Sequence, residues 1–134
     1  MVVTKTETLP LETEQDIVAA RQAVRKLTQQ LAFSIVDQTK MVTATSELAR
    51  NTLIHGGGGT MQWETLVDGI KKGLRLHFVD QGRGIANLEL AITDGWTSGT
   101  GLGMGLSGSK RLVHEFQIES QLGQGTRVTI ARWK

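Results

Sequence analysis

The chain has 134 residues, a length typical of one domain, and 39% of them are hydrophobic, which is enough for a core. Its net charge of +2 comes from scattered Lys and Arg, and it has three Trp, three Phe and no Tyr, so neither charge nor stacking favours nucleic-acid binding. The absence of cysteine excludes disulfides, thiolate metal sites and Cys nucleophiles, and without a signal-like or membrane-length apolar run we expect a cytoplasmic protein with no membrane contact.

The first third of the chain predicts an edge strand and two helices. Residues 2–11 are rich in Val and Thr, and the proline among them suits the edge of a sheet. A cap at Thr13 begins a helix whose apolar residues recur every three or four positions, namely Ile17, Ala20, Val24, Leu27 and Leu31. A second cap at Ser34 begins a helix that we expect to run to His55, with Gly56 as its C-cap.

A polar stripe on the second predicted helix is the first candidate site. Glu47, Asn51 and His55 lie four residues apart, so they form one slowly drifting line along the helix. Such a stripe is usually a solvated face. An acid and an amide on a helix otherwise rich in small and apolar residues also fit a functional surface.

A hairpin follows the run Gly56–Gly59. Residues 61–67 and 74–80 alternate in polarity as half-buried strands do, and Asp68-Gly69 marks the turn between them. Because Asp80 continues the alternation of Leu76 and Phe78, its carboxylate should point inward. A buried carboxylate needs donors, which either the following turn or a ligand N–H can supply.

The remaining pattern completes the fold class. We expect a short helix at 87–93, a glycine-rich loop at 94–105, a helix at 106–115, a strand at 116–120, a tight turn at 122–125 and a strand at 126–133. Antiparallel hairpins with helices on one face predict an α/β (α+β) two-layer sandwich, with a mixed, mostly antiparallel sheet.

The glycine-rich loop is a candidate phosphate site. Its alternating glycines precede a helix N-terminus, which offers free N–H groups and a positive dipole end, although a mobile surface loop is the plain alternative. A dinucleotide fingerprint is excluded because no strand directly precedes the loop. A P-loop is excluded because Gly108-Ser109-Lys110 has the wrong order.

Four motifs stand in one order along the chain: Glu47-x-x-x-Asn51, Asp80-x-Gly82-x-Gly84, Gly99-x-Gly101-x-Gly103-x-Gly105 and Gly123-x-Gly125-Thr126. The series resembles the ATP-binding domain shared by gyrase, the heat-shock chaperone of the same fold, histidine kinases and mismatch-repair ATPases, the GHKL or Bergerat fold. The resemblance covers residues 1–134 as a single domain. Within the family it is most similar to the serine/threonine kinases of bacterial partner switching, particularly the stressosome type.

The resemblance implies ATP and Mg²⁺ as cofactors. Asp80 would accept the adenine amino group beside Thr126, with Gly82 and Gly84 allowing close approach. The amide oxygen of Asn51 would bind Mg²⁺, and Glu47 would orient or deprotonate the attacking hydroxyl. The glycine-rich loop would be the ATP lid, and together with the start of the next helix it would face the phosphates through Gly99, Gly101, Leu102, Gly103, Met104, Gly105 and Leu106.

Two further residues are candidate phosphate contacts. His55 follows Asn51 by one helical turn, but a histidine at a helix C-terminus also interacts with the helix dipole. Lys110 could contact phosphate or a partner, whereas most exposed cations are simply solvated.

The resemblance also implies the partners. The kinase would phosphorylate a serine or threonine on a STAS-domain protein, leave it, and then bind and activate a metal-dependent phosphatase. The alternative is an anti-sigma factor that sequesters a sigma subunit, with the kinase reaction as its release switch. A nucleotide-dependent scaffold and a purely hydrolytic ATPase are further alternatives, and a homodimer occurs among relatives.

Overall fold

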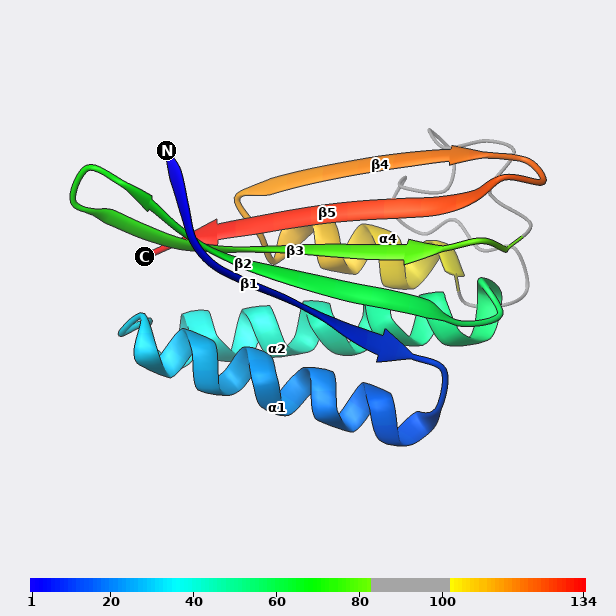
Figure 1. Cartoon of the computed structure of the whole chain (residues 1–134), viewed down its shortest axis with the longest axis horizontal. Helices are drawn as coiled ribbons and strands as arrows, with labels where there is room; N and C mark the ends of the chain where they lie inside the picture. The colour runs from blue at the N-terminus through cyan, green and yellow to red at the C-terminus, as the bar shows by residue number, and fades with distance from the viewer. Residues whose placement is uncertain (83–101) are drawn as a thin grey trace.

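The computed structural model describes residues 1–82 and 102–134, which form a five-stranded sheet with helices on one face (Figure 1). In chain order the elements are β1 (Val2–Leu11), α1 (Glu14–Gln30), α2 (Ile35–Arg50), η1 (Asn51–His55), β2 (Gly59–Asp68), β3 (Lys71–Asp80), α4 (Leu102–Arg111), β4 (Glu115–Gln121) and β5 (Gly125–Trp133). The sheet order is β1-β2-β3-β5-β4, and all four pairings are antiparallel. The helix expected at 87–93 lies outside the described residues.

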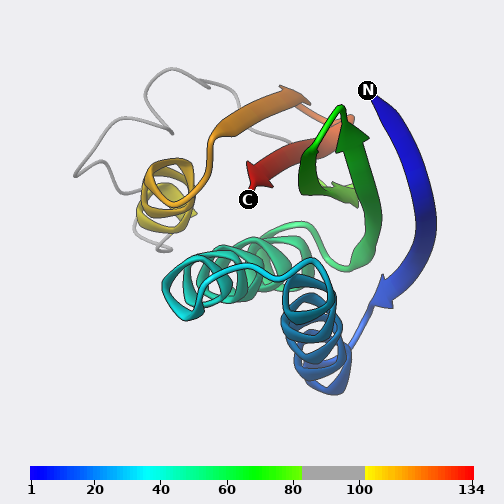
Figure 2. The same ribbon diagram turned by 90° about the vertical axis from the view of Figure 1, so that its left-hand side faces the viewer.

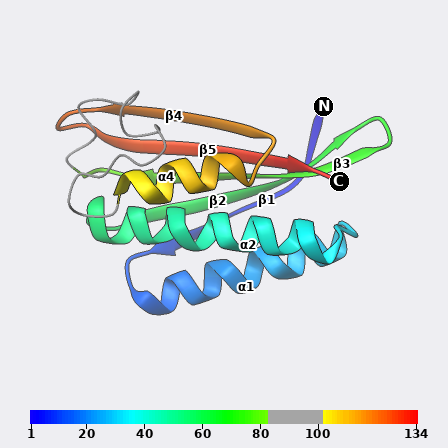
Figure 3. The same ribbon diagram turned by 180° about the vertical axis from the view of Figure 1, so that it is seen from behind.

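The two layers are plain when the molecule is viewed end-on. Figure 2 shows the sheet curving around one side, with α1, α2 and α4 gathered on the other. From behind, α4, α2 and α1 lie side by side across the sheet (Figure 3). The two-layer sandwich is therefore confirmed, and β1 occupies an edge as expected. Within the described ranges no helix is both long and apolar enough to cross a membrane.

The caps predicted for the first two helices are present. Thr13 and Asp16 form a reciprocal capping box at the start of α1, and the Ser34 hydroxyl accepts the backbone N–H of Asp37 at the start of α2. These bonds satisfy amide groups that a helix start leaves without partners. Four of the five predicted stripe residues of α1 are buried, while Leu31 is half-buried at the C-cap.

The end of the second helix differs from an ordinary α-helix. After Arg50 the chain continues as the π-helical turn η1, in which the Gly56 N–H donates to the Asn51 carbonyl over 3.0 Å. Gly56 is the C-cap as expected, and the left-handed conformation falls on Gly57 (φ +74°). Single π turns occur frequently at functional sites.

The core lies between the helices and the covered face of the sheet. Its completely or almost completely buried side chains come from both layers and include Leu11, Ile17, Met41, Leu48, Met61, Leu74, Leu76, Phe78, Leu106 and Ile130. Fully burying each such side chain contributes about 1.5–3 kcal/mol. This packing fixes the helices against the strand ends that carry the site.

The helix α4 corrects the boundaries expected from the sequence. It begins at Leu102 rather than 106, so residues 102–105 are helical and not loop, and it ends at Arg111 rather than 115. Glycine disfavours helix, but burial of Leu106 and Ser109 beneath the sheet outweighs that preference. Its end is set by β5, because the His114 N–H already donates to the Ala131 carbonyl over 3.0 Å.

An ion pair between Arg132 and Asp37 joins the sheet to the helix layer near the end of β5. Arg132 near the end of β5 donates to the Asp37 carboxylate over 2.6 Å and to the Leu112 carbonyl over 3.0 Å. We call these three residues the terminal clamp, since they join β5 to the start of α2 and the end of α4. The neighbouring guanidinium holds the pKa of Asp37 below its usual value.

The uncovered face of the sheet carries a second charged group. Glu64 on β2 accepts from Arg75 over 2.7 Å and contacts the His77 ring over 2.5 Å, and Arg127 lies 3.2 Å from the other ring nitrogen of His77. The hydrogen bond from Arg75 is the main cause of a lowered pKa of Glu64. Arg75 and His77 thus lie opposite the core-facing residues of β3, as their alternation predicts.

Candidate functional site

The candidate site lies at one end of the sheet, where several elements begin or end together. β3 ends at Asp80 between the start of β2 and the start of β5, because Asp80 pairs with both Gly59 and Thr126. The η1 turn ends beside the same carboxylate, and α4 packs against η1. The fold therefore brings together residues from positions 47–59, 80–82 and 125–126.

Asp80 is the chemical centre of this end. Its side chain points to the core face, as predicted, and the residue is only 9% exposed. Desolvation raises its pKa, and hydrogen bonds from the backbone N–H groups of Gly82 and Thr126 partly oppose that rise. The Gly82 N–H lies 2.9 Å from one carboxylate oxygen. The sequence left open whether the following turn or a ligand supplies the donors. The turn supplies one through the Gly82 N–H, but this bond uses only part of the carboxylate's capacity to accept hydrogen bonds.

Three glycines let the backbone close around Asp80. A Cβ on Gly56 would overlap the Asp80 side chain, and a Cβ on Gly125 would overlap the Asp80 carbonyl. A Cβ on Gly82 would come within 2.7 Å of Gly56 Cα. The resemblance assigned Gly82 to close approach of the nucleotide, which stays a prediction, and the sequence gave Gly56 only a capping role.

The helix side of the site is formed by the polar stripe. Glu47 is exposed on α2, and Asn51 is half-buried at the start of η1. The Asn51 side-chain nitrogen is buried, and among the described residues it has no hydrogen-bond partner. An amide held in this way retains bonding capacity for a ligand. His55 is half-buried one turn further on and makes an interaction of its own.

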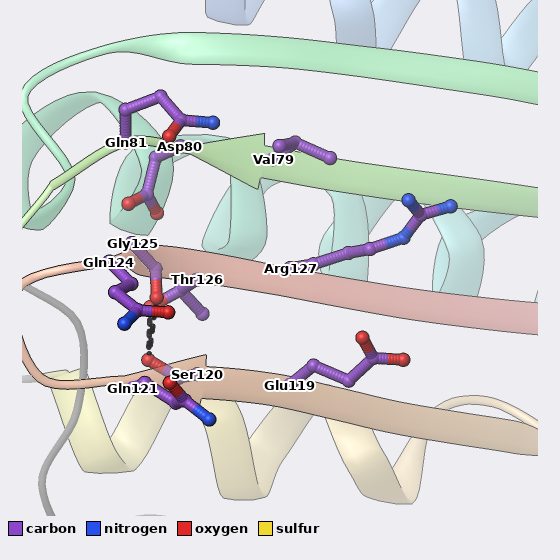
Figure 4. A pocket seen from close by; sticks show the side chains of 10 residues that line it. All are labelled: Val79, Asp80, Gln81, Glu119, Ser120, Gln121, Gln124, Gly125, Thr126 and Arg127. Carbon is purple, nitrogen blue, oxygen red and sulfur yellow. Dashed lines mark hydrogen bonds between the residues drawn. The ribbon is translucent and has the colours of Figure 1, made fainter.

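A pocket of about 340 Å³ opens beside the strand ends, mainly on the uncovered face, because its lining residues Val79, Glu119 and Arg127 alternate with core-facing residues. Figure 4 shows Asp80, Gly125 and Thr126 at its end, with Arg127 and Glu119 further along the strands. In the same view a dashed line joins Ser120 on β4 to the start of β5. Ser120 was not singled out by the sequence, because a lone serine in a strand carries no pattern that could reveal it.

The predicted phosphate-binding residues are placed only in part. Gly84, Gly99 and Gly101 lie outside the described residues, and of Leu102, Gly103, Met104 and Gly105 only the helical backbone is described. Leu106 is 1% exposed and packs in the core, so it contributes no exposed side chain. Lys110 is exposed in the last turn of α4, about 12 Å along the helix from its start.

The described residues contain no group of three or more His, Cys, Asp or Glu that could hold a metal by themselves. A metal at this end would therefore rely on few protein ligands. Mg²⁺ commonly binds in this way, through one or two side chains together with phosphate oxygens and water.

Comparison with known proteins agrees with this architecture. RsbT, a serine/threonine-protein kinase of Bacillus subtilis, is 45% identical over 121 residues, which cover 90% of this chain and 91% of the relative. The anti-sigma F factor of Clostridium kluyveri is 31% identical over 119 residues, covering 84% of this chain and 82% of the relative.

A solved structure with a similar fold contains the RsbU and RsbW domains of a Mycobacterium tuberculosis protein. The TM-score is 0.61 at 19% identity, over 96% of this chain, which spans only 32% of that solved chain. Residues 36–134 match the family described as histidine kinase-, DNA gyrase B- and HSP90-like ATPases. Because this match covers most of the chain and includes the strands and helices around Asp80, the chain belongs to the histidine kinase-, DNA gyrase B- and HSP90-like ATPase family.

Proposed function

We propose that this protein is an ATP-dependent protein serine/threonine kinase that acts in the cytoplasm on a regulatory partner protein. The observation that carries the proposal is the buried Asp80 carboxylate, which has backbone donors but no ion pair with a cation among the described residues. It lies at the same end of the molecule as Glu47 and Asn51. The 45% identity to a serine/threonine-protein kinase supports the same activity.

Asp80 would bind the adenine of ATP. A buried carboxylate that retains free lone pairs accepts an N–H strongly, and the exocyclic amino group of adenine supplies one. Gly56, Gly82 and Gly125 let the surrounding backbone lie close to Asp80, which would limit the access of water to this contact. We include Thr126, directly opposite Asp80 on β5, in the same base-binding group.

Asn51 would hold Mg²⁺ through its side-chain oxygen. The fit rests on the buried Asn51 amide, whose nitrogen has no partner in the described part of the chain and can donate to a phosphate oxygen while the amide oxygen binds the ion. The ion would neutralise phosphate charge. The backbone N–H groups at the start of α4, at Leu102 and beyond, would face the same phosphates.

Glu47 would act on the hydroxyl of the incoming substrate. It lies one turn before Asn51 and is exposed, so a hydroxyl presented by another protein can reach its carboxylate. A carboxylate in this position orients the hydroxyl and accepts its proton as the phosphoryl group is transferred. His55 is a further candidate contact for phosphate, whereas we expect Lys110 to remain a surface cation.

The proposed substrate is a serine or threonine on a STAS-domain protein, and we propose that the released kinase then binds and activates a metal-dependent phosphatase. The anti-sigma F factors among the relatives favour one alternative, in which the protein sequesters a sigma subunit and phosphorylation releases it. The two functions share the nucleotide site and differ in the protein that is bound.

The test is transfer of labelled γ-phosphate from Mg-ATP to a STAS-domain protein encoded near this one. We expect label on a serine or threonine of that partner. Glu47→Ala should lose transfer by about 10²–10⁴-fold while retaining ATP binding, because general-base catalysis contributes that much. Asp80→Asn should weaken both ATP binding and transfer. As a matched control, Glu14→Ala removes an exposed carboxylate from α1 and should change neither.

Three outcomes separate the alternatives. Transfer that is unchanged in Glu47→Ala would remove that residue from its proposed role. ATP binding without transfer to the partner would favour the sequestering function, and a stable complex with a sigma factor would then be expected. ATP hydrolysis at the same rate with and without a protein acceptor would indicate a simple ATPase.

A further inference from the structure

Three polar side chains form a row across the strands at the site. Asp80 on β3 pairs with Thr126 on β5, and Thr126 pairs with Ser120 on β4. Directly opposed residues in an antiparallel sheet point to the same face, with Cβ atoms about 4.5–5.5 Å apart. The Thr126 hydroxyl therefore lies between the Ser120 hydroxyl and the Asp80 carboxylate.

The hydrogen bonds of Ser120 determine which way the Thr126 proton points. The Ser120 hydroxyl donates to the Gly125 carbonyl over 2.9 Å, and a carbonyl can only accept. Ser120 has one hydroxyl proton, so it is the acceptor in its 2.8 Å contact with the Thr126 hydroxyl. Thr126 must then donate to Ser120, and only its lone pairs remain for other groups.

We propose that Ser120 is a positioning residue that makes this site selective for 6-aminopurine nucleotides over 6-oxopurine nucleotides. The inference rests on the proposed nucleotide site. With the Thr126 proton committed to Ser120, both Asp80 and Thr126 present only acceptors to the base. An exocyclic amino group carries two N–H donors, enough for both. A 6-oxo group has only lone pairs to offer, and the N1–H of such a base can pair with only one of the two buried acceptors, so the other is left unpaired.

Removing the Ser120 hydroxyl releases the Thr126 proton. In Ser120→Ala, Thr126 can turn to donate either to the Asp80 carboxylate or to a 6-oxo group of the base. The first competes with the adenine amino group for Asp80, and the second favours the wrong nucleotide. Both changes reduce the preference for ATP, in proportion to one buried hydrogen bond.

The experiment measures dissociation constants of the whole chain for ATP and for inosine triphosphate, which differ at the purine 6-position. We expect the ratio of the two constants to fall about tenfold in Ser120→Ala, as loss of one hydrogen bond implies. Ser120→Thr retains a hydroxyl and should restore most of the ratio. Gln117→Ala removes an exposed polar side chain from the same strand and should leave the ratio unchanged.

A second background separates positioning from a general weakening of the site. In Thr126→Val there is no Thr126 proton to direct, so a further Ser120→Ala change should leave the ratio as it is. Thermal unfolding of each variant shows that the fold is retained.

An unchanged ratio in Ser120→Ala, with ATP still bound by the wild type, would overturn the inference alone. A fall of the same size in the Thr126→Val background would also overturn it. Failure of the wild type to bind either nucleotide would overturn the proposed function together with the inference.

Discussion

The two ends of β5 each lie beside a carboxylate, and the pKa of the two carboxylates is shifted in opposite directions. Near the end of the strand, Arg132 donates to Asp37, and the pKa of that carboxyl falls below its usual value. At the start of the strand, Thr126 lies opposite Asp80, whose pKa is raised by desolvation. Among the described residues no cation pairs with Asp80, although Asp80 is the more deeply buried of the two carboxylates.

The difference separates a structural carboxylate from a functional one. Burying an uncompensated carboxylate destabilises a fold, and a cation partner such as Arg132 is the usual remedy. Asp80 is held by backbone N–H groups and surrounded by glycines, so its binding capacity is retained instead of being used within the protein. Perturbed carboxyls in such settings are typical of functional sites.

Of the variants that test this difference, Asp80→Asn should have the largest effect, which we expect on ATP affinity. An amide has one acceptor oxygen in place of two, so we expect ATP affinity to fall by about 10–100-fold, the effect of one charge-assisted hydrogen bond. The unfolding free energy should stay equal or rise by about 1 kcal/mol, since a desolvated charge is removed. Calorimetric titration and thermal denaturation measure the two quantities. Unchanged affinity would show that Asp80 is not a ligand.

Gly56→Ala should disturb the same carboxylate through space. Its φ of −90° suits any residue, so the added Cβ acts only by overlapping the Asp80 side chain. We expect about 1–3 kcal/mol of destabilisation with weakened ATP binding. Gly108→Ala is the control, because a Cβ there meets nothing within 4 Å and alanine favours helix, which should stabilise α4 slightly. Equal effects from both variants would contradict the steric argument.

Arg132→Met should remove the ion pair with Asp37 at the other end of β5. It leaves Asp37 without its cation and the Leu112 carbonyl without its donor, so about 1–2 kcal/mol of unfolding free energy should be lost. ATP affinity should not change, because the terminal clamp lies at the opposite end of β5. Adding Asp37→Asn should recover part of the loss. A drop in ATP affinity as large as that in Asp80→Asn would show that the two ends are coupled.

The smallest of the expected effects is a difference between the two carboxylates in how stability depends on pH. Asp37 has a lowered pKa, so its stabilisation is present above its ordinary value of 3.8 and is lost as the pH falls through the folded pKa. Asp80 has a raised pKa, so its destabilisation applies at neutral pH and disappears toward 3.8. The stability gained in Asp80→Asn should therefore shrink on acidification. Chemical denaturation from pH 7 to pH 4 tests this, and a constant gain would contradict it.

Much of the fold could be predicted from local patterns. The Thr13 and Ser34 caps, the apolar stripe of α1 and the alternation leading to Asp80 each depend on residues close together in the sequence, and each is confirmed. The bounds of α4 could not be predicted in the same way. They depend on burial of Leu106 under the sheet and on the pairing of His114 with β5, which are long-range contacts.

The site residues that belong to short sequence motifs could be predicted. The Asp80 and Asn51 motifs predicted two polar side chains that the structure places on elements at the same end of the sheet, but their roles in binding remain proposals. The contact between Gly56 and Asp80 joins two segments that are far apart in the chain, and the row of polar side chains formed by Asp80, Thr126 and Ser120 joins three strands. No local pattern encodes such contacts, because each becomes visible only when the strand register is known.

The register of β5 positions both the site and the terminal clamp. Thr126 and Arg132 are separated by an even number of positions, so both point to the helix layer. A slip of one residue would turn both side chains to the open face at once. A slip of this kind therefore removes the terminal clamp and displaces Thr126 from the site together, so the loss of stability and the loss of the site would occur in the same molecules.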